Sequence, residues 1–157
     1  MIKCTFEDDG KGLLRHAVVD MLVIKDNQIL LVKRAPHLTN GNKYALVGGF
    51  MERDETSKQT ALRETMEETG YKAEIIDLFR IIDHPNRRGE DRQNISFVYL
   101  VKPLEKTGTS DREVKELKWF NLDKLPTPEE FAFDHLENIQ LYLQHLKTPF
   151  TLPIIGK

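Results

Sequence analysis

The sequence predicts an α+β sandwich (α/β/α) in which helices cover a mixed β-sheet. Its 157 residues suit one domain, so we expect a single domain over residues 1–157. Short runs rich in Val and Ile, separated by polar turns, are typical of strands. Two segments with helix start signals interrupt and follow these runs. An order of strands, helix, strands and helix favours helices packed on a sheet.

The first part of the chain predicts two β-hairpins and a short strand. An N-terminal hairpin is expected within residues 1–15, around an Asp-Asp-Gly turn. A second hairpin is expected from His16–Ile24 and Ile29–Val32, because the residues between them are polar. A short strand over Tyr44–Val47 is expected to end at Gly48-Gly49.

The segment Ser57–Thr69 has the clearest helical pattern in the chain. Thr56 and Gln59 form a capping box at its start, and Gly70 supplies a left-handed stop after its last turn. One face of this helix is expected to pack on the sheet. That face consists of Leu62, Thr65, Met66 and Thr69.

The second part of the chain predicts three strands and a terminal helix. The strands are expected within Ala73–Asp83, Asn94–Val101 and Glu116–Phe120. A short helix starts at Thr127, and a helix over residues 134–147 closes the chain. The apolar stripe of that helix consists of Leu136, Ile139, Leu143 and Leu146.

Composition and charge exclude several classes of protein. Lys and Arg total 23 against 25 Asp and Glu, which argues against non-specific nucleic-acid binding. The single cysteine, Cys4, cannot form an internal disulfide. The apolar stretch Ala17–Ile24 is interrupted by Asp20 and is too short to span a bilayer, and the start of the chain does not resemble a signal peptide. We therefore expect a cytoplasmic protein without nucleic-acid or membrane partners.

Three carboxylates recur on one side of the predicted helix. Glu64, Glu67 and Glu68 stand at i, i+3 and i+4, within about 100° of one another. Like charges at this spacing near a helix C-terminus are mildly destabilising. One interpretation is a solvated acidic face, partly compensated by Lys58 and Arg63. The other is a cluster of hard oxygen ligands for Mg²⁺ or Mn²⁺ that acts on a phosphate-bearing substrate.

The residues around this helix complete a longer pattern of 22 positions. Its fixed members are Gly49, Glu55, Arg63, Glu64, Glu67, Glu68 and Gly70. This spacing is that of the Nudix box, and the sequence resembles the Nudix hydrolase family, which implies the Nudix fold. Two positions that are usually bulky and aliphatic hold Thr65 and Tyr71. Neither departure removes an acid, and for Thr65 we expect only a change in packing.

The resemblance implies a reaction class and a metal site. Nudix enzymes split a pyrophosphate linkage in a nucleoside diphosphate joined to another group. Glu64 and Glu68 would be metal ligands, and Glu67 a further ligand or a partner of metal-bound water. The carbonyl of Gly48 would be the ligand that is not a carboxylate. The implied cofactor is Mg²⁺, with Mn²⁺ as an alternative, which would neutralise the pyrophosphate and acidify a bound water.

The resemblance also implies supporting roles and a general base. Arg63 and Glu55 would join the helix to its loop by a charge-assisted hydrogen bond. Relatives often carry a base or another ligand near the positions of Glu113 and Glu116, and we favour Glu113. The alternative is that both are simply exposed acids. Glu52, beside the box, is expected to be structural.

A second stretch bears on the substrate. Asp83–Gln93 resembles the Asp-x-Pro-x-Arg segment of small ADP-ribose pyrophosphatases, and Ala132–His135 resembles another motif of that group. The chain departs from the group at residues 87–90, which read Arg-Arg-Gly-Glu. The implied reaction converts ADP-ribose to AMP and ribose 5-phosphate. The alternatives are a (d)NTP pyrophosphatase that releases pyrophosphate, and a regulator that binds a nucleotide without cleaving it.

Five residues are candidates for contacts with this small-molecule nucleotide. The guanidinium groups of Arg87, Arg88 and Arg92 suit the diphosphate or terminal ribose, unless they form a solvated charge run. Arg15 is a candidate phosphate contact. Phe50 is a candidate for stacking on a base, with a place in the core as the alternative.

Other residues near these motifs receive weaker expectations. Lys33-Arg34 is a further candidate phosphate contact, whereas His84 and His135 are expected to be structural. Tyr44 is expected to lie in the core. The resemblance to sugar-nucleotide enzymes implies a homodimer, with the hairpin of residues 1–15 as its candidate interface.

Overall fold

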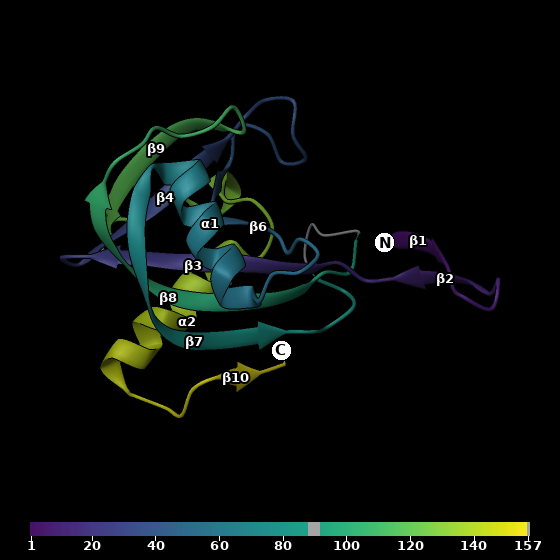
Figure 1. The fold of residues 1–157 in the computed structure, drawn as a ribbon. Helices are drawn as coiled ribbons and strands as arrows, with labels where there is room; N and C mark the ends of the chain where they lie inside the picture. The colour runs from purple at the N-terminus through teal and green to yellow at the C-terminus, as the bar shows by residue number, and fades with distance from the viewer. Residues whose placement is uncertain (88–91, 157) are drawn as a thin grey trace.

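The computed structural model describes residues 1–87 and 92–156, which form a mixed β-sheet with a helix on each face (Figure 1). In chain order the elements are β1 (Ile2–Thr5), β2 (Lys11–Leu14), β3 (Ala17–Lys25), β4 (Gln28–Arg34), β5 (Tyr44–Ala45), β6 (Val47–Phe50), α1 (Ser57–Thr69), β7 (Tyr71–Ile82), β8 (Ile95–Lys106), β9 (Val114–Asn121), a short 3-10 helix (Pro128–Glu130), α2 (His135–Lys147) and β10 (Ile154–Ile155). The predicted sandwich of helices on a mixed sheet is confirmed.

Strand β3 is the centre of the main sheet. The strand order is β10-β7-β8-β3-β4-β5, and in addition β6 pairs with β3 and β9 pairs with β4. β3 runs parallel to β8 but antiparallel to β6. It meets β4 only beside their shared turn, where Asp26 and Asn27 both have positive φ. The second predicted hairpin is therefore confirmed, and its two strands then diverge to different partners.

The alternation of side chains along β3 divides the core into two clusters. Val19 packs in the cluster that includes Ala61 of α1, whereas Leu22 packs in the cluster that includes Ile139 of α2. Because successive side chains of a strand point to opposite faces, Asp20 lies on the α2 face, on the same side as Leu22. This acid interrupts the apolar, buried part of the strand.

Both predicted ends of α1 are confirmed. The Thr56 side chain accepts a hydrogen bond from the Gln59 N–H at 3.3 Å, and the Gln59 side chain accepts one from the Thr56 N–H at 2.9 Å. Gly70 ends the helix in the left-handed region, with φ 73°.

The buried face of α1 is only partly the predicted one. Thr65 and Thr69 are buried as expected, but Leu62 is 39% exposed and Met66 is half-buried. The other buried members are Thr60, Ala61 and Glu68. The helix is rotated so that small side chains face the sheet. In this orientation Glu68 reaches the backbone of β6, which it could not do if Leu62 were at the centre of the buried face.

The predicted strand Tyr44–Val47 is wrong in its bounds. It is divided at Leu46, where pairing changes from β4 to β3, and Gly48-Gly49 lies within β6 instead of ending the strand. The N–H of Leu46 donates to Nδ1 of His135 at 2.9 Å. A side chain from α2 therefore takes the place of a strand partner at the division.

The terminal helix also differs in detail from its prediction. It starts at His135, and the Asp134 side chain makes no capping hydrogen bond. Ile139 is buried and packs with Leu136 and Leu143, whereas Leu146 is 54% exposed, so its place on the apolar stripe was wrong. Among the residues that the structure describes, no helix is both long and apolar enough to cross a bilayer.

The N-terminal hairpin is confirmed as a separate two-stranded sheet. β1 and β2 pair antiparallel from Ile2 opposite Leu14 to Thr5 opposite Lys11, and the hairpin extends away from the main sheet (Figure 1). Several apolar side chains in it are exposed. They are Met1, Ile2, Phe6, Leu13 and Leu14.

The contact at Gly70 makes a prediction about stability. A Cβ at this position would lie 2.2 Å from the carbonyl oxygen of Gly108, in addition to the cost of the left-handed backbone. We expect Gly70→Ala to lower the free energy of unfolding by about 3 kcal/mol. Gly156 has a similar φ of 78° but no atom near its absent Cβ, so Gly156→Ala should cost only about 1 kcal/mol. Urea unfolding of both variants measures the difference, and equal losses would contradict the role of the Gly108 contact.

Candidate functional site

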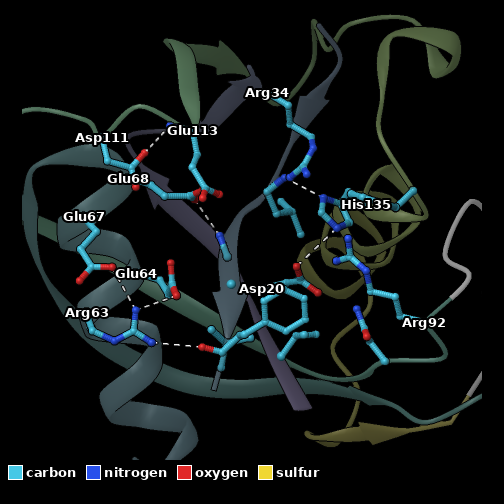
Figure 2. A pocket seen from close by; sticks show the side chains of 18 of the residues that line it. Asp20, Arg34, Arg63, Glu64, Glu67, Glu68, Arg92, Asp111, Glu113 and His135 are labelled. Atoms are coloured by element: carbon cyan, nitrogen blue, oxygen red, sulfur yellow. Dashed lines mark hydrogen bonds and ion pairs between the residues drawn. The ribbon is translucent and has the colours of Figure 1, made fainter. Parts of the chain in front are cut away.

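A cavity of about 340 Å³ opens between α1, β6, the loop before β9 and the start of α2 (Figure 2). On one side lie acidic side chains, and on the other lie mainly nitrogen-bearing ones. The acidic side consists of Glu64, Glu67, Glu68, Asp111 and Glu113. The opposite side includes Asp20, Arg34, Arg92 and His135. Arg87, Asn94 and Phe50 also line the cavity.

The two glycines of β6 allow close approaches on different sides of the strand. The Gly48 N–H donates to Oε2 of Glu68 at 2.9 Å. A Cβ on Gly49 would lie 2.3 Å from the Glu64 carboxylate, and one on Gly48 would lie 2.3 Å from the carbonyl oxygen of Val19. The absence of a side chain at Gly49 therefore leaves room for the Glu64 carboxylate against the strand, whereas its absence at Gly48 allows the close pairing of β6 with β3.

Burial makes the two inner carboxylates costly to charge. Burial raises the pKa of Glu68 well above its usual value, although the hydrogen bond from Gly48 opposes this effect. Burial also raises the pKa of Glu64, opposed by its hydrogen bond with Arg63. Two adjacent acids of this kind suit a site at which a cation offsets their charge.

The three box glutamates reach the cavity to different depths. Glu68 is 7% exposed, whereas the Glu67 side chain is 49% exposed. Arg63 donates from Nη1 to Glu64 at 2.7 Å and to Glu67 at 3.0 Å. Within the described residues, no three His, Cys, Asp or Glu side chains are close enough in their present positions to hold a metal together.

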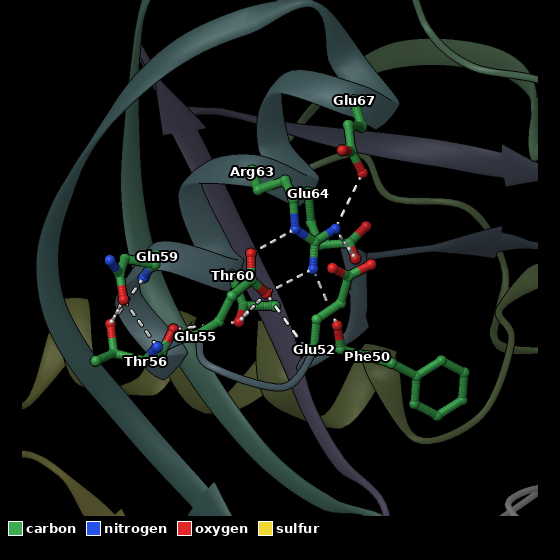
Figure 3. Close-up of polar contacts among 9 residues, drawn as sticks. All are labelled: Phe50, Glu52, Glu55, Thr56, Gln59, Thr60, Arg63, Glu64 and Glu67. Carbon is green, nitrogen blue, oxygen red and sulfur yellow. Dashed lines mark hydrogen bonds and ion pairs between the residues drawn. The ribbon is translucent and has the colours of Figure 1, made fainter.

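The predicted link between Arg63 and Glu55 is confirmed (Figure 3). Arg63 donates from Nε to one Glu55 oxygen at 2.8 Å and from Nη2 to the other at 2.9 Å, and also to the carbonyl of Phe50. These bonds lower the pKa of Glu55 to about 2. Thr60 adds a further hydrogen bond to Glu55, and the backbone of Glu52 also bonds to Glu55. Glu52 lines the cavity as well, so its expected structural role stays a prediction.

The loop before β9 brings two more acids to the cavity. The Asp111 N–H donates to the Glu67 carbonyl at 3.0 Å, and the Asp111 carboxylate accepts from the Glu113 N–H at 2.9 Å. Glu113 lines the cavity, whereas Glu116 lies on β9 opposite Lys33 and does not. Sequence reasoning missed Asp111. The available signal was the position of Asp111 two residues before Glu113, a spacing that is typical of an Asx turn.

A buried network forms the opposite side of the cavity. Nδ1 of His135 accepts the Leu46 N–H, and its Nε2 lies 3.4 Å from Oδ1 of Asp20. The Ser96 hydroxyl donates to Oδ2 of Asp20. Burial lowers the pKa of His135, and a donor at Nδ1 requires the ring proton to be on Nε2. His135 is therefore neutral and has its Nε2 directed at Asp20, and its expected structural role stays a prediction because it also lines the cavity.

Sequence reasoning also missed Asp20 as part of the site. The signal was present, since Asp20 is the only charged residue in the apolar run Ala17–Ile24. An acid in a strand buried on both faces requires polar partners. Those partners come from Ser96 on β8 and from α2, and pairing across the sheet is not visible in the sequence.

Arg87 belongs to this buried network. Its guanidinium group forms two hydrogen bonds with the Asp134 carboxylate, at 2.7 and 2.8 Å, and lies 3.9 Å from Asp20. Burial raises the pKa of Asp134, but the hydrogen bonds and charge of Arg87, together with smaller contributions from His135 and the backbone, hold that pKa below its usual value. The alternative of a solvated charge run is wrong for Arg87, whose side chain is only 5% exposed. Its fork is held by Asp134, which also explains why Asp134 does not cap α2.

Phe50 and Arg92 lie together at the rim of the cavity. The Arg92 guanidinium group lies 5.3 Å from the centre of the Phe50 ring, and the His16 ring lies 4.9 Å from it. Phe50 is 42% exposed, so a place in the core is wrong for it, whereas Tyr44 is buried against Phe120 as expected.

The remaining candidate contacts separate into two groups. Arg34 lines the cavity beside the Phe133 ring, and burial lowers its pKa. Lys33, in contrast, lies over the Tyr44 ring and outside the cavity lining. His84 accepts the N–H of Asn86 in a turn, which is structural as expected.

Arg15 does not have the place that was expected of it. It donates to the backbone carbonyls of Asp83, Gln93 and Asn94, and it is absent from the cavity lining. Its observed role is to tie the N-terminal segment to the loop after β7. Arg88 lies outside the described residues.

The Arg63–Glu55 pair predicts a pH dependence of stability. Because the pKa of Glu55 is about 2 in the folded chain and near 4.5 without its partner, the pair stabilises the fold above pH 4.5 and this gain is lost as the pH falls toward 2. We expect Glu55→Gln to lower the urea midpoint at pH 6 and to differ less from the unsubstituted chain at pH 3. Asp54→Asn is the control, because its ion pair with Arg53 is exposed and should contribute little. A Glu55→Gln deficit that is constant with pH would contradict this account.

Comparison with known proteins identifies the family. A model of the NUDIX domain matches residues 14–142. An ADP-ribose pyrophosphatase of Methanocaldococcus jannaschii is 34% identical over 126 residues, covering 80% of this chain and 72% of the relative.

Solved structures agree in fold. A NUDIX hydrolase from Nitrosomonas europaea superposes with a TM-score of 0.79 over 99% of this chain and 92% of the other, at 23% identity. A bifunctional NMN adenylyltransferase/ADP ribose pyrophosphatase from Francisella tularensis, complexed with AMP and a manganese ion, matches with a TM-score of 0.66 at 27% identity. That match covers 85% of this chain but 42% of the longer protein. The chain belongs to the Nudix family.

Proposed function

We propose that this protein hydrolyses the pyrophosphate bond of a nucleoside diphosphate sugar, with ADP-ribose giving AMP and ribose 5-phosphate. The observation that carries the proposal is the position of Glu64 and Glu68 against Gly48-Gly49, across one cavity from several guanidinium groups. The name of the archaeal relative, an ADP-ribose pyrophosphatase, supports this choice of substrate.

The donor set of the acidic side fits a hard divalent cation. Glu64, Glu68 and the Gly48 carbonyl would hold Mg²⁺, with Mn²⁺ as an alternative and Glu67 as a further ligand or water partner. The burial of the Glu64 and Glu68 carboxylates supports this fit. When bound, the metal would neutralise phosphate charge and acidify a water molecule.

The other residues of the cavity have separate tasks. Glu113 would act as the general base that accepts a proton from the attacking water. Arg92, held over Phe50, would face the diphosphate, and Arg87 would contribute positive charge from its pair with Asp134. Catalysis of this kind depends mostly on positioning and electrostatic stabilisation. Arg88 stays a candidate contact from sequence alone.

We further propose a homodimer formed through the hairpin of residues 1–15, with the rest of the chain as one domain. An isolated two-stranded hairpin is marginally stable in water, yet this one exposes Leu13 at 61% and Leu14 at 47%. A second copy of the chain would cover these side chains. We also propose a cytoplasmic location, because Cys4 alone cannot form an internal disulfide.

Turnover of ADP-ribose with Mg²⁺ tests the proposed activity. We expect release of AMP and ribose 5-phosphate. Chromatography of the nucleotide product measures this release. We expect Glu68→Gln to lower kcat/KM at least about a hundredfold and Glu113→Gln to lower kcat by about the same factor. The matched control is Glu116→Gln, an exposed acid on the same strand region but outside the cavity, which should behave like the unsubstituted chain.

The same assay separates the alternative functions. Preferential turnover of a (d)NTP would overturn the substrate and keep the metal site, whereas nucleotide binding without turnover in Mg²⁺ and Mn²⁺ would indicate a regulator. Normal turnover by Glu68→Gln would contradict the site itself. Thermal unfolding of each variant confirms that the fold is retained.

The proposed dimer is tested by one substitution in the hairpin. Leu13→Arg should shift the chain from dimer to monomer, because it places charge at an apolar interface. Leu104→Arg is the control, since Leu104 is similarly exposed, at 55%, but lies in β8. Light scattering during gel filtration measures the masses of both variants and of the unsubstituted chain. A monomeric unsubstituted chain would contradict the proposed dimer.

A further inference from the structure

Asp20 is a buried acid to which the proposed reaction gives no task. It is 6% exposed, lines the cavity and lies across it from the glutamates of α1 (Figure 2). The Ser96 hydroxyl, Nε2 of His135 and the more distant guanidinium group of Arg87 hold its carboxylate in place. Groups from three parts of the fold thus hold the Asp20 carboxylate at the cavity.

The backbone of Gly48 separates Asp20 from the acidic side. The Gly48 N–H bonds to Glu68 at 2.9 Å, while a Cβ on Gly48 would come within 3.0 Å of Oδ1 of Asp20. These two carboxylates therefore flank the same residue. A pyrophosphate that lies over Gly48 with one end toward Glu68 has its other end toward Asp20.

The chemistry of a carboxylate decides what that other end can be. A carboxylate offers about four acceptor positions. At Asp20 the Ser96 hydroxyl occupies one of them, and Nε2 of His135 lies 3.4 Å from Oδ1. Sugar hydroxyls can donate to the remaining positions. A terminal phosphate offers acceptor oxygens and negative charge, which a nearby carboxylate repels.

The positive groups beside Asp20 do not cancel this preference. Arg87, the nearest of them, has its Nε and Nη2 on Asp134, so that part of its charge is offset within the network. His135 directs its Nε2 at Asp20 and has Nδ1 occupied by Leu46. Asn94, a buried amide that also lines the cavity, adds a group able to accept from or donate to a hydroxyl.

We propose that Asp20 is a specificity-determining residue. It accepts hydrogen bonds from the hydroxyls of the sugar attached to the second phosphate, and it disfavours substrates that carry a third phosphate there. This inference rests on the proposed function and deepens it, since it explains why a nucleoside diphosphate sugar is preferred to a nucleoside triphosphate.

ADP-ribose and ATP form a matched pair of probes, because both contain ADP and differ in the group attached to its second phosphate. The experiment measures kcat/KM for both in Mg²⁺ with the unsubstituted chain and with Asp20→Asn. We expect Asp20→Asn to shift the ratio toward ATP by about tenfold or more, mainly through a higher KM for ADP-ribose. Asp20→Ser replaces it if thermal unfolding shows that the Asn variant does not fold.

Two controls separate this role from a structural one. Ser96→Ala removes a hydrogen bond to Asp20 but keeps its charge, so the ratio should stay within about threefold of the original. Isothermal titration with ribose 5-phosphate should show weaker binding to Asp20→Asn, whereas binding of AMP should not change.

The outcomes for the two proposals differ. An unsubstituted chain that prefers ATP, or that cleaves neither probe, overturns the proposed function. If the unsubstituted chain and Asp20→Asn prefer ADP-ribose to ATP by the same ratio of kcat/KM, only the role of Asp20 is overturned. An equal loss of kcat for both probes, with KM unchanged, also overturns it, because that result is expected of a purely structural acid.

Discussion

The close approach of α1 to β6 is the constraint on which the rest of the site depends. The glycine at position 49 leaves room for Glu64 to lie against the strand, and the Gly48 N–H holds the Glu68 carboxylate. Arg63 then ties the same helix to Glu55 in the loop that precedes it. These contacts hold the loop and the helix together beneath the cavity.

The cavity combines groups from both faces of the sheet. Glu68 reaches it from the α1 face, whereas Asp20 and His135 reach it from the α2 face, and both sets meet where the backbone of Gly48 is bare. This arrangement separates two kinds of chemistry within a small volume. Acids that suit a cation lie on one side, and a fixed hydrogen-bonding network lies on the other.

Charge pairing within the network has consequences for neighbouring elements. Asp134 stands at the N-cap of α2 but bonds to Arg87 instead of the helix, so the helix start gives up a capping bond to hold a cavity residue in place. Leu46 likewise bonds to His135 at the point where β5 gives way to β6. In both places local backbone bonding is set aside for the geometry of the site.

The sequence by itself determined most of the elements and the three box glutamates on the acidic side of the site. Helix α1, with its capping box and Gly70, and the spacing of Glu64 to Glu68 depend on contacts within a few residues, which pattern and propensity record. The tertiary structure alone decided how the network on the opposite side of the cavity is assembled. Whether Asp20 faces α1 or α2, and that Arg87 meets Asp134 47 residues later, depends on strand register and helix packing, which local sequence does not specify.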